Sequence, residues 1–236
     1  MAVNFRIAGA LAATATQTTL NIVAPTTGVI ANDIFIVSIL GKDNQVITVP
    51  DATWTKFVEV NNTTAQRTTL AWKRVIAGDA GATFAFTKPT DNNVLFCGMI
   101  ACYSGALISA TPIDASTPTT SANALSDTVT YATFDPAETT AFVVAVGTYN
   151  ENLTTAGSIS GTDPTFANNW DLETATGTDG SIFGKSGSSS GAATGARSHS
   201  TTSTDDGIST GVLFGLIAFV PPDTTNPGYQ SRLGWF

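Results

Sequence analysis

Two uninterrupted apolar segments constrain the fold of this chain most strongly. The first is residues 94–103 (VLFCGMIACY), and Ser104-Gly105 ends it. The second is residues 212–220 (VLFGLIAFV), and two prolines end it. Short apolar runs bounded by turn residues are typical of strands that are buried on both faces. The likeness of the two runs predicts two strands in equivalent places of a duplicated unit.

The segments that precede each run also occur in a repeated order. The matching pairs are 18–23 with 127–133, 33–40 with 141–147, Trp54 with Trp170, 68–75 with 181–185, and 83–87 with 195–202. The offset is 108 residues from Leu20 to Thr128, 116 from Trp54 to Trp170 and 118 from Val94 to Val212. A duplication with one longer loop, at residues 150–168, would give this step. The alternative is a chance alignment of apolar runs.

The two apolar runs align best when Cys97 is skipped. A slip of one residue along a strand moves all later side chains to the other face of the sheet. We therefore expect a β-bulge near Cys97-Gly98.

The fold class follows from the spacing of turn residues. No segment has a sustained helical period with caps, and turn signals recur about every 8–12 residues, as in β-sandwiches. The sequence predicts an all-β, antiparallel β-sandwich or jelly roll built from two tandem repeated units, either separate or packed as one domain. The expected organisation is an N-terminal arm or leading strand (1–17), a first β-sandwich unit (18–105), a connection (106–126), a second β-sandwich unit (127–222) and a C-terminal tail (223–236).

Composition disfavours two classes of partner. The 236 residues carry a net charge of −8, and the ten Lys and Arg are scattered, whereas phosphate binding needs them clustered. We therefore expect no nucleic-acid partner. No apolar run approaches the ~18 residues of a transmembrane helix, so we expect no membrane span. About one residue in six is threonine, which suits a pleated, half-exposed surface without charge.

Two motifs invite a chemical interpretation, and we discount both. Residues 180–186 (GSIFGKS) are similar to a phosphate-binding loop, but they have three residues between the glycines where the motif needs four. His199 could join Asp205 or Asp206 in a triad, but no G-x-S-x-G elbow supplies a nucleophile. We expect His199 to be solvated, and the two aspartates lack the spacing of a calcium loop.

The remaining titratable residues do not form a predicted site. Asp163, Asp171 and Glu173 are too scattered for paired catalytic carboxylates. An offset of five places Cys97 and Cys102 on opposite faces of one strand, so we expect buried free thiols. We predict no catalytic residue, no cofactor and no metal site.

The aromatic residues divide into a core set and a terminal set. Trp54, Trp72 and Trp170 are expected to pack in the core rather than to form a sugar-stacking surface. The tail ends in aromatic residues, so it either folds back on its own domain or anchors on a partner. The N-terminus, which faintly resembles a signal peptide, is expected to be a leading strand or an arm packed on a neighbour. The predicted partner-contact residues are Tyr229, Arg232, Leu233, Trp235, Phe236 and Phe5.

The chain resembles a family of virion structural proteins of tailed bacteriophages and prophages, with the pattern GD-L-L-V-A … W … Y-R-V … Y-T-F-T … Y-x-G-V … P-I-D. The resemblance covers residues 18–222 and departs from the pattern at Asn32 and Ala106. It implies a jelly-roll protein without family catalytic residues. It rests on Asp33 to Val37, Trp54, Leu70 to Val75, Thr83 to Thr87, Tyr103-Ser104-Gly105 and Pro112-Ile113-Asp114.

The resemblance leads to two expected functions. The first is a non-enzymatic decoration or cement protein on the outer surface of the phage head, which contacts the major capsid protein or tail proteins and forms a homo-oligomer. The second is a receptor-binding or glycan-binding module of a tail fibre or baseplate, with loops 150–168 and 184–207 as its binding surface. An enzyme, such as a glycan depolymerase, is disfavoured.

Overall fold

A computed structural model describes residues 2–62, 65–108, 110–123, 128–139, 141–151, 153–160, 163–173, 180–203 and 207–219. Within these ranges the regular elements are sixteen β-strands, and no helix occurs. All pairings between strands are antiparallel, as short hairpin-like connections predict. The all-β fold class is therefore confirmed.

The first half of the chain builds one main sheet. Its strand order is β1-β8-β4-β6-β5, and β2 also pairs with β8. The central strand β4 is buried along all eight residues because both of its faces are covered. The bounds are β1 Asn4–Ala8, β2 Ala12–Thr14, β4 Ile34–Gly41, β5 Trp54–Asn62, β6 Gln66–Arg74 and β8 Phe96–Ser104.

The second half of the chain builds the other main sheet. Its strand order is β13-β14-β11-β16-β9. Strand β16 lies between β9 and β11, and β8 lies between β4 and the N-terminal strands, so residues 96–103 and 212–216 of the two apolar runs lie in interior, buried strands. Residues 217–219 of the second run lie beyond the end of β16 and are partly exposed. The bounds are β9 Thr119–Asn123, β11 Phe142–Tyr149, β13 Ala167–Glu173, β14 Ser181–Ser188 and β16 Ser209–Leu216.

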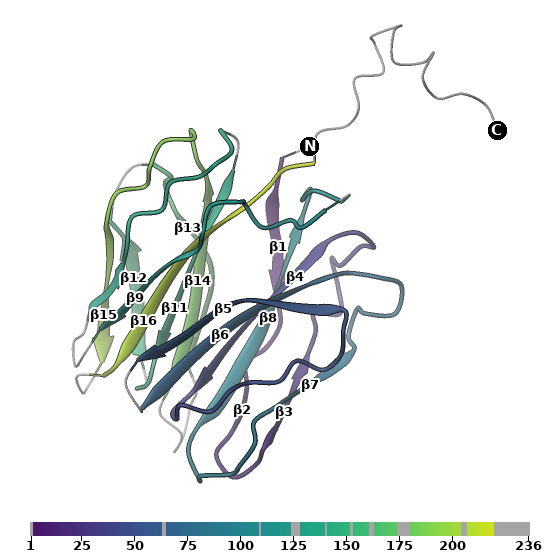
Figure 1. The fold of residues 1–236 in the computed structure, drawn as a ribbon, viewed down its shortest axis with the longest axis vertical. Helices are drawn as coiled ribbons and strands as arrows, with labels where there is room; N and C mark the ends of the chain where they lie inside the picture. The colour runs from purple at the N-terminus through teal and green to yellow at the C-terminus, as the bar shows by residue number, and fades with distance from the viewer. Residues whose placement is uncertain are drawn as a thin grey trace, which may run out of the picture.

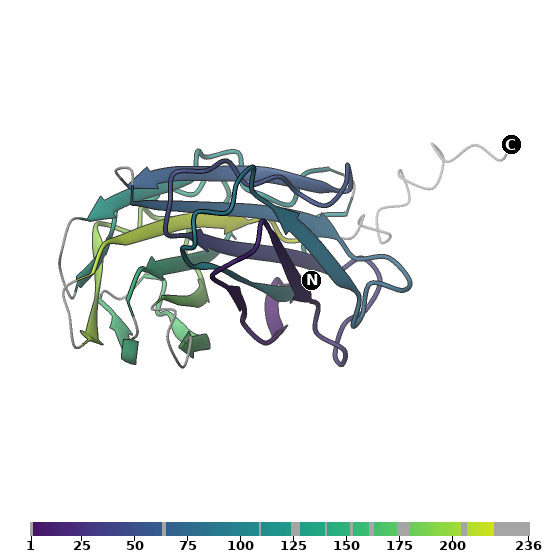
Figure 2. The ribbon, with the colours of Figure 1, turned by 90° about the horizontal axis from the view of Figure 1, so that it is seen from below.

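Two smaller sheets complete the molecule. The pair β3 (Thr19–Val23) and β7 (Thr83–Thr87) covers the outer face of the first main sheet. The trio β10 (Thr128–Tyr131), β15 (Arg197–Ser203) and β12 (Leu153–Ile159) covers the outer face of the second. Figure 1 shows the strands of the first half, purple to blue, beside the green and yellow strands of the second, and Figure 2 shows them from below.

The two main sheets face each other across a shared apolar core. Alternate residues of β4, Ile34, Ile36 and Leu40, point into this core, and Val144 and Val146 of β11 meet them from the other sheet. The odd residues of β4 point instead toward β3 and β7. The molecule therefore has four β-layers, and its two halves pack as one body.

The two main sheets have the same strand order when their members are matched in sequence. Here β8, β4, β6 and β5 correspond to β16, β11, β14 and β13, and the edge position of β1 corresponds to that of β9. The outer strands β3 and β7 likewise correspond to β10 and β15. In the second half, β12 pairs with β15 as a third outer strand. In the first half, the corresponding place beside β7 holds only the isolated bridge from Thr48 to Thr87. Common ancestry of the halves remains a prediction that their superposition would test.

The structure corrects several boundaries. Residues 1–17 include β1 and β2 on the main sheet, which agrees with the leading-strand alternative for this segment. The connection 106–126 includes strand β9, which the sequence did not predict. No bulge occurs at Cys97-Gly98, because β8 keeps one continuous register with β4 from Phe96 to Tyr103. The predicted loop regions 150–168 and 184–207 contain all of strands β12 and β15 and parts of β13 and β14, because their polar residues pair in the second main sheet and its outer layer. Residues 45–49 take part in pairing only through the isolated bridge from Thr48 to Thr87.

Candidate functional site

The residues that resemble a phosphate loop form a strand. Residues 181–186 lie within β14, which pairs with β11 on one side and with β13 on the other. A phosphate loop presents free backbone N–H groups to the anion. The ladders on both sides of β14 use these groups, so this segment has no cradle for a nucleotide.

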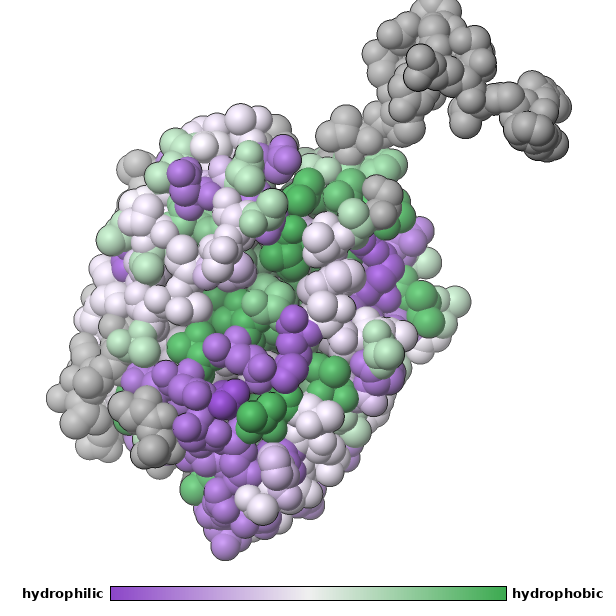
Figure 3. All heavy atoms as spheres, viewed as in Figure 1, coloured by the Kyte–Doolittle hydropathy of each residue, from purple (hydrophilic) through white to green (hydrophobic). Residues whose placement is uncertain are grey.

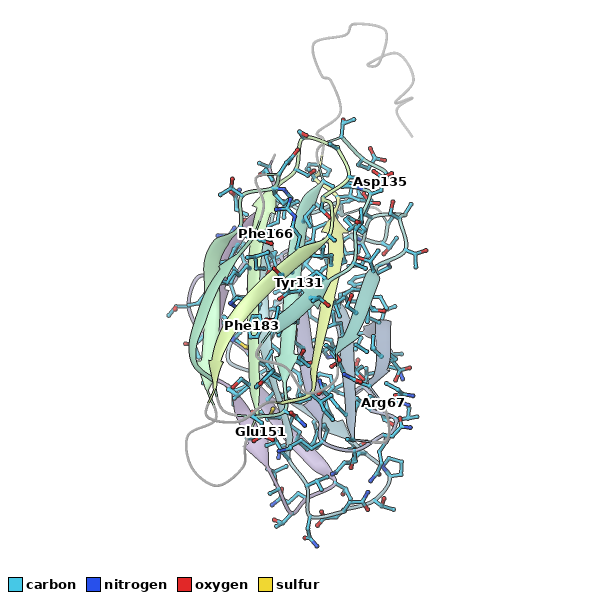
Figure 4. All side chains as sticks on the ribbon, turned by 90° about the vertical axis from the view of Figure 1, so that its left-hand side faces the viewer. Arg67, Tyr131, Asp135, Glu151, Phe166 and Phe183 are labelled. Carbon is cyan, nitrogen blue, oxygen red and sulfur yellow. The ribbon has the colours of Figure 1, made fainter. Side chains whose placement is uncertain are left out.

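His199 lies in the outer layer of the second half rather than in solvent. Its imidazole is fully buried and meets the Phe183 ring edge-on, with 4.4 Å between centroids. The expectation of a solvated histidine is wrong, because the inward face of β15 covers the second main sheet. Figure 4 shows the labelled Phe183 and Tyr131 within this half. Asp205 and Asp206 lie outside the described residues.

The three scattered carboxylates do not come together as a described site. Asp163 accepts hydrogen bonds from the side chain and backbone N–H of Ser190, which lower the pKa of its carboxyl. The side chains of Asp171 and Glu173 lie outside the described set. Among the side chains that are described, no group of three or more His, Cys, Asp or Glu could hold a metal ion.

Both cysteines are buried free thiols on opposite faces of β8, as the spacing predicts. Cys97 points between the main sheets, and Cys102 points toward the outer pair β3-β7. Burial raises the pKa of Cys97 to about 12. Burial, and then the nearby Asp33 carboxylate, raise the pKa of Cys102. Neither thiol is a nucleophile at neutral pH.

The charged residues of the first half stabilise loops from the inside. Lys88 Nζ lies 3.1 Å from Asp43 Oδ2 with its side chain fully buried, and Lys73 Nζ lies 2.6 Å from Asp79 Oδ2. Asp79 also accepts the N–H of Ile76, which closes the loop after β6. These pairs therefore fix turns and do not face a substrate.

The other described cations are also engaged within the chain. Arg197 donates to the carbonyl oxygens of Thr194, Ser160 and Asp163, and burial lowers its pKa. Arg74 donates to the carbonyl oxygens of Asn32 and Leu107 and connects two loops. The further cases are Arg6 with Asp33, Lys42 with Glu151, Lys56 and Arg67 with Glu59, and Lys185, which is buried. The described part of the chain thus presents no cluster of unengaged cations.

The joint between the two halves contains several residues of the phage-like pattern. The Asp114 carboxylate is buried and accepts the N–H groups of Ser116, Ala137 and Glu138. Ile113 bridges to Leu216 of β16. Asp114 therefore links the connection between the halves to the loop after β10.

Gly105 makes the turn at the end of β8 possible. Its φ is +74°, and a Cβ at this position would lie 2.1 Å from the backbone oxygen of Ala2. Only glycine fits a left-handed conformation with such a close approach. The Tyr-Ser-Gly element of the pattern thus allows the N-terminal strand to cross the end of β8.

A buried polar cluster joins the main sheets at the end opposite this joint. Gln66 Nε2 donates to Thr148 Oγ1 at 2.9 Å and lies 3.4 Å from Thr210 Oγ1. The hydroxyl groups of Thr68 and Thr148 lie 2.6 Å apart. Asn62 Nδ2 donates to a backbone oxygen of β16. Sequence reasoning missed this cluster, because a polar residue in a strand indicates a solvent-facing side.

Shallow grooves on the described surface include one beside each edge strand of the first main sheet, β5 and β1. One, of about 320 Å³, lies between the edge strands β5 and β9 and is lined by residues 57–61, Thr117, Pro118 and Thr120. The other, of about 270 Å³, is lined by residues 7–10 and 23–27. The first is the better candidate binding site, because Phe57 and Pro118 lie beside polar Glu59, Asn61 and Thr120.

The predicted partner-contact residues mostly fall beyond the described chain. Tyr229, Arg232, Leu233, Trp235 and Phe236 lie outside the described residues. Phe5 is half-buried and meets Tyr103 of its own chain edge-on at 5.7 Å. Trp54 packs in the core against Phe84 and Phe86, as predicted. Trp72 packs against the shared core but is partly exposed, and the Trp170 side chain is not among those described.

Comparison of the chain with protein-family models, with curated proteins and with solved structures finds no match. In the described ranges, no helix is long and apolar enough to cross a membrane.

Proposed function

We propose that this chain is a non-enzymatic structural protein of a tailed-phage virion. It decorates the outer surface of the head, where it contacts the major capsid protein and further copies of itself. The observation that most supports the proposal is the role of the phage-like pattern in the structure. Asp33, Gly105 and Asp114 of that pattern hold turns and the joint between the halves. The residues of the pattern thus stabilise the fold itself, as expected for a protein with a structural function in a particle.

The distribution of charge supports the same proposal. The described lysines and arginines are engaged inside the chain, while the net charge of the sequence is −8. DNA repels an acidic protein whose described part has no basic face, so the outside of a head suits it better than the inside. A shared core between the halves gives one stiff body, which suits a protein that is bound to a lattice.

A second candidate function is glycan or receptor binding on a tail fibre or baseplate. The observation that favours it is the groove between β5 and β9, which combines Phe57 and Pro118 with the polar side chains of Glu59, Asn61 and Thr120. Sugar sites often combine an aromatic face with hydrogen-bonding groups. The groove is shallow, so such binding would be weak for a single copy and would need several copies for avidity.

Negative-stain electron microscopy with a gold-labelled antibody tests both functions. The antibody is raised against the purified protein, and the particles are made by cells that carry the gene. Label spread over the heads supports decoration, and label on fibres or baseplate supports the second candidate. Purified particles that contain none of the protein by mass spectrometry would overturn both. A glycan array with the wild type and with Asn61→Ala, whose side chain is exposed in the groove, tests whether sugars bind there.

A further inference from the structure

One end of the molecule exposes three isoleucines on neighbouring loops. The isoleucine patch consists of Ile30, Ile76 and Ile108, with 56%, 57% and 46% of each residue exposed. Arg74 holds their loops together, because it donates to the carbonyl oxygens of Asn32 and Leu107. Figure 3 shows apolar surface at this end, where β1 begins in Figure 1.

The exposure of two of these isoleucines is built into matching turns. In residues 30–33 and 76–79, an aspartate Oδ2 accepts the N–H of the isoleucine three residues earlier. The third residue of each turn has a positive φ, +74° at Asn32 and +95° at Gly78. The turns therefore fix both isoleucines in exposed positions. Exposed isoleucines on neighbouring loops that are fixed in this way offer an apolar surface to a partner.

The last described residues lie at this same end. Phe219 donates its N–H to Gly105 O at 2.8 Å, and Leu107, next to Ile108, donates to Ile217 O at 2.8 Å. Seventeen residues, 220–236, follow Phe219 in the sequence, and they include Tyr229, Leu233, Trp235 and Phe236. The apolar tail thus begins beside the apolar patch.

The order of residues in the tail favours a return to its own starting point. Pro221-Pro222 favours an extended segment, and Asn226-Pro227-Gly228 is a strong turn signal. The limb before the turn (220–225) and the limb after it (229–236) are of similar length. At about 3.3 Å per residue, an extended second limb would be long enough to return to the level of Phe219.

We propose that residues 229–236 dock on the isoleucine patch of their own chain. The short connection keeps the tail at a high effective concentration near its own patch, which favours this contact over the same contact with a second copy. Docking would cover the patch with Trp235 and Phe236. The proposal concerns a contact within one chain and does not rest on a place in a virion.

Trp235 reports on this contact directly. The fluorescence of Trp235 alone is obtained by subtracting the fluorescence of Trp235→Phe from that of the wild type. We expect this signal to be protected from acrylamide at every protein concentration between about 1 and 100 μM. In the variant Ile30→Ser, Ile76→Ser, Ile108→Ser, quenching should rise several-fold. The matched control is Val46→Ser, because Val46 is 48% exposed at the opposite end, and it should leave quenching unchanged.

Three results would overturn the proposal. In the first, acrylamide quenches Trp235 in the folded wild type as readily as in urea. In the second, Trp235 is protected from acrylamide only at high protein concentration. In the third, Trp235 remains protected in the variant with three serine substitutions. The second result would assign the tail to a patch on another copy. As an independent measurement, deletion of residues 229–236 should increase binding of a hydrophobic dye, and the serine substitutions should abolish that increase.

Discussion

The shared core predicts that the two halves unfold together, and one pair of aromatic rings tests this. Phe57 of β5 and Phe214 of β16 belong to different halves, and their rings meet edge-on with centroids 5.0 Å apart. Phe214 is fully buried between the main sheets, and Phe57 is partly buried beside it. We consider Phe57→Ala, Phe214→Ala and the double variant.

The structure gives the expected magnitudes. Replacing a buried phenylalanine by alanine costs about 3–5 kcal/mol, so Phe214→Ala should lose that much. Phe57→Ala should lose less than Phe214→Ala, because the Phe57 side chain is only partly buried and part of its surface already contacts water. An aromatic pair contributes roughly 0.5–1.5 kcal/mol beyond its buried area, and the double variant should be more stable than the sum of losses predicts by that amount.

Urea unfolding, followed by tryptophan fluorescence and by far-ultraviolet circular dichroism, measures these values. We expect one transition with the same midpoint for both probes. Phe84→Ala is the control, because Phe84 packs against Phe35 and Trp54 in the first half only, and its loss should add to that of Phe214→Ala within about 0.5 kcal/mol. Two separate transitions, or no coupling between Phe57 and Phe214, would refute a core shared by the halves.

Three further changes have defined outcomes. Lys88→Met should cost about 3–5 kcal/mol by leaving the Asp43 carboxylate buried without its partner, and adding Asp43→Asn should recover most of the loss in urea unfolding. Gly105→Ala should lower the melting temperature far more than Gly195→Ala. Both glycines have a positive φ, but a Cβ at position 105 would lie 2.1 Å from a backbone oxygen, whereas a Cβ at position 195 would have nothing within 4 Å. The folded pKa of Cys97, about 12, exceeds the roughly 8.5 of an unfolded thiol. The contribution of this thiol to stability is therefore complete below about pH 8.5 and is lost as pH rises, at about 1.4 kcal/mol per pH unit. The unfolding free energy of Cys97→Ala should decline less steeply between pH 8 and pH 10 than that of the wild type.

The strands that the sequence predicts well are those with a clear apolar pattern. The alternation in β3 and β7 and the continuous apolar residues of β4, β8, β11 and β16 follow directly from burial on one face or on both. The bounds of β4, β8 and β11 lie within about two residues of the predicted segments, whereas β16 begins at Ser209 and ends at Leu216 instead of spanning residues 212–220. Burial therefore made the middle of each main sheet predictable.

The strands that the sequence does not predict are mostly at edges. Strand β9 (TTSAN) and strand β12 (LTTAGSI) are polar and rich in threonine, and neither has an apolar period that would mark it. Each is a strand because a neighbour, β16 or β15, offers an unpaired ladder. Pairing of this kind depends on tertiary contact and leaves little trace in local sequence.

Register explains why the alignment of the two apolar runs was misleading. When the halves are matched through their central strands, Ile34 of β4 corresponds to Phe142 of β11, and the ladder partners of these residues are Tyr103 and Leu216. The offset between β8 and β16 is then 113 residues, not 118. An offset of 118 would match Phe96 with Phe214, but Phe96 points to the outer pair β3-β7 and Phe214 points between the main sheets. A difference of five residues reverses the faces, and a strand that is apolar on both faces does not reveal the reversal in its composition. The bulge expected at Cys97 was a consequence of that alignment, and the ladder between β4 and β8 does not require it.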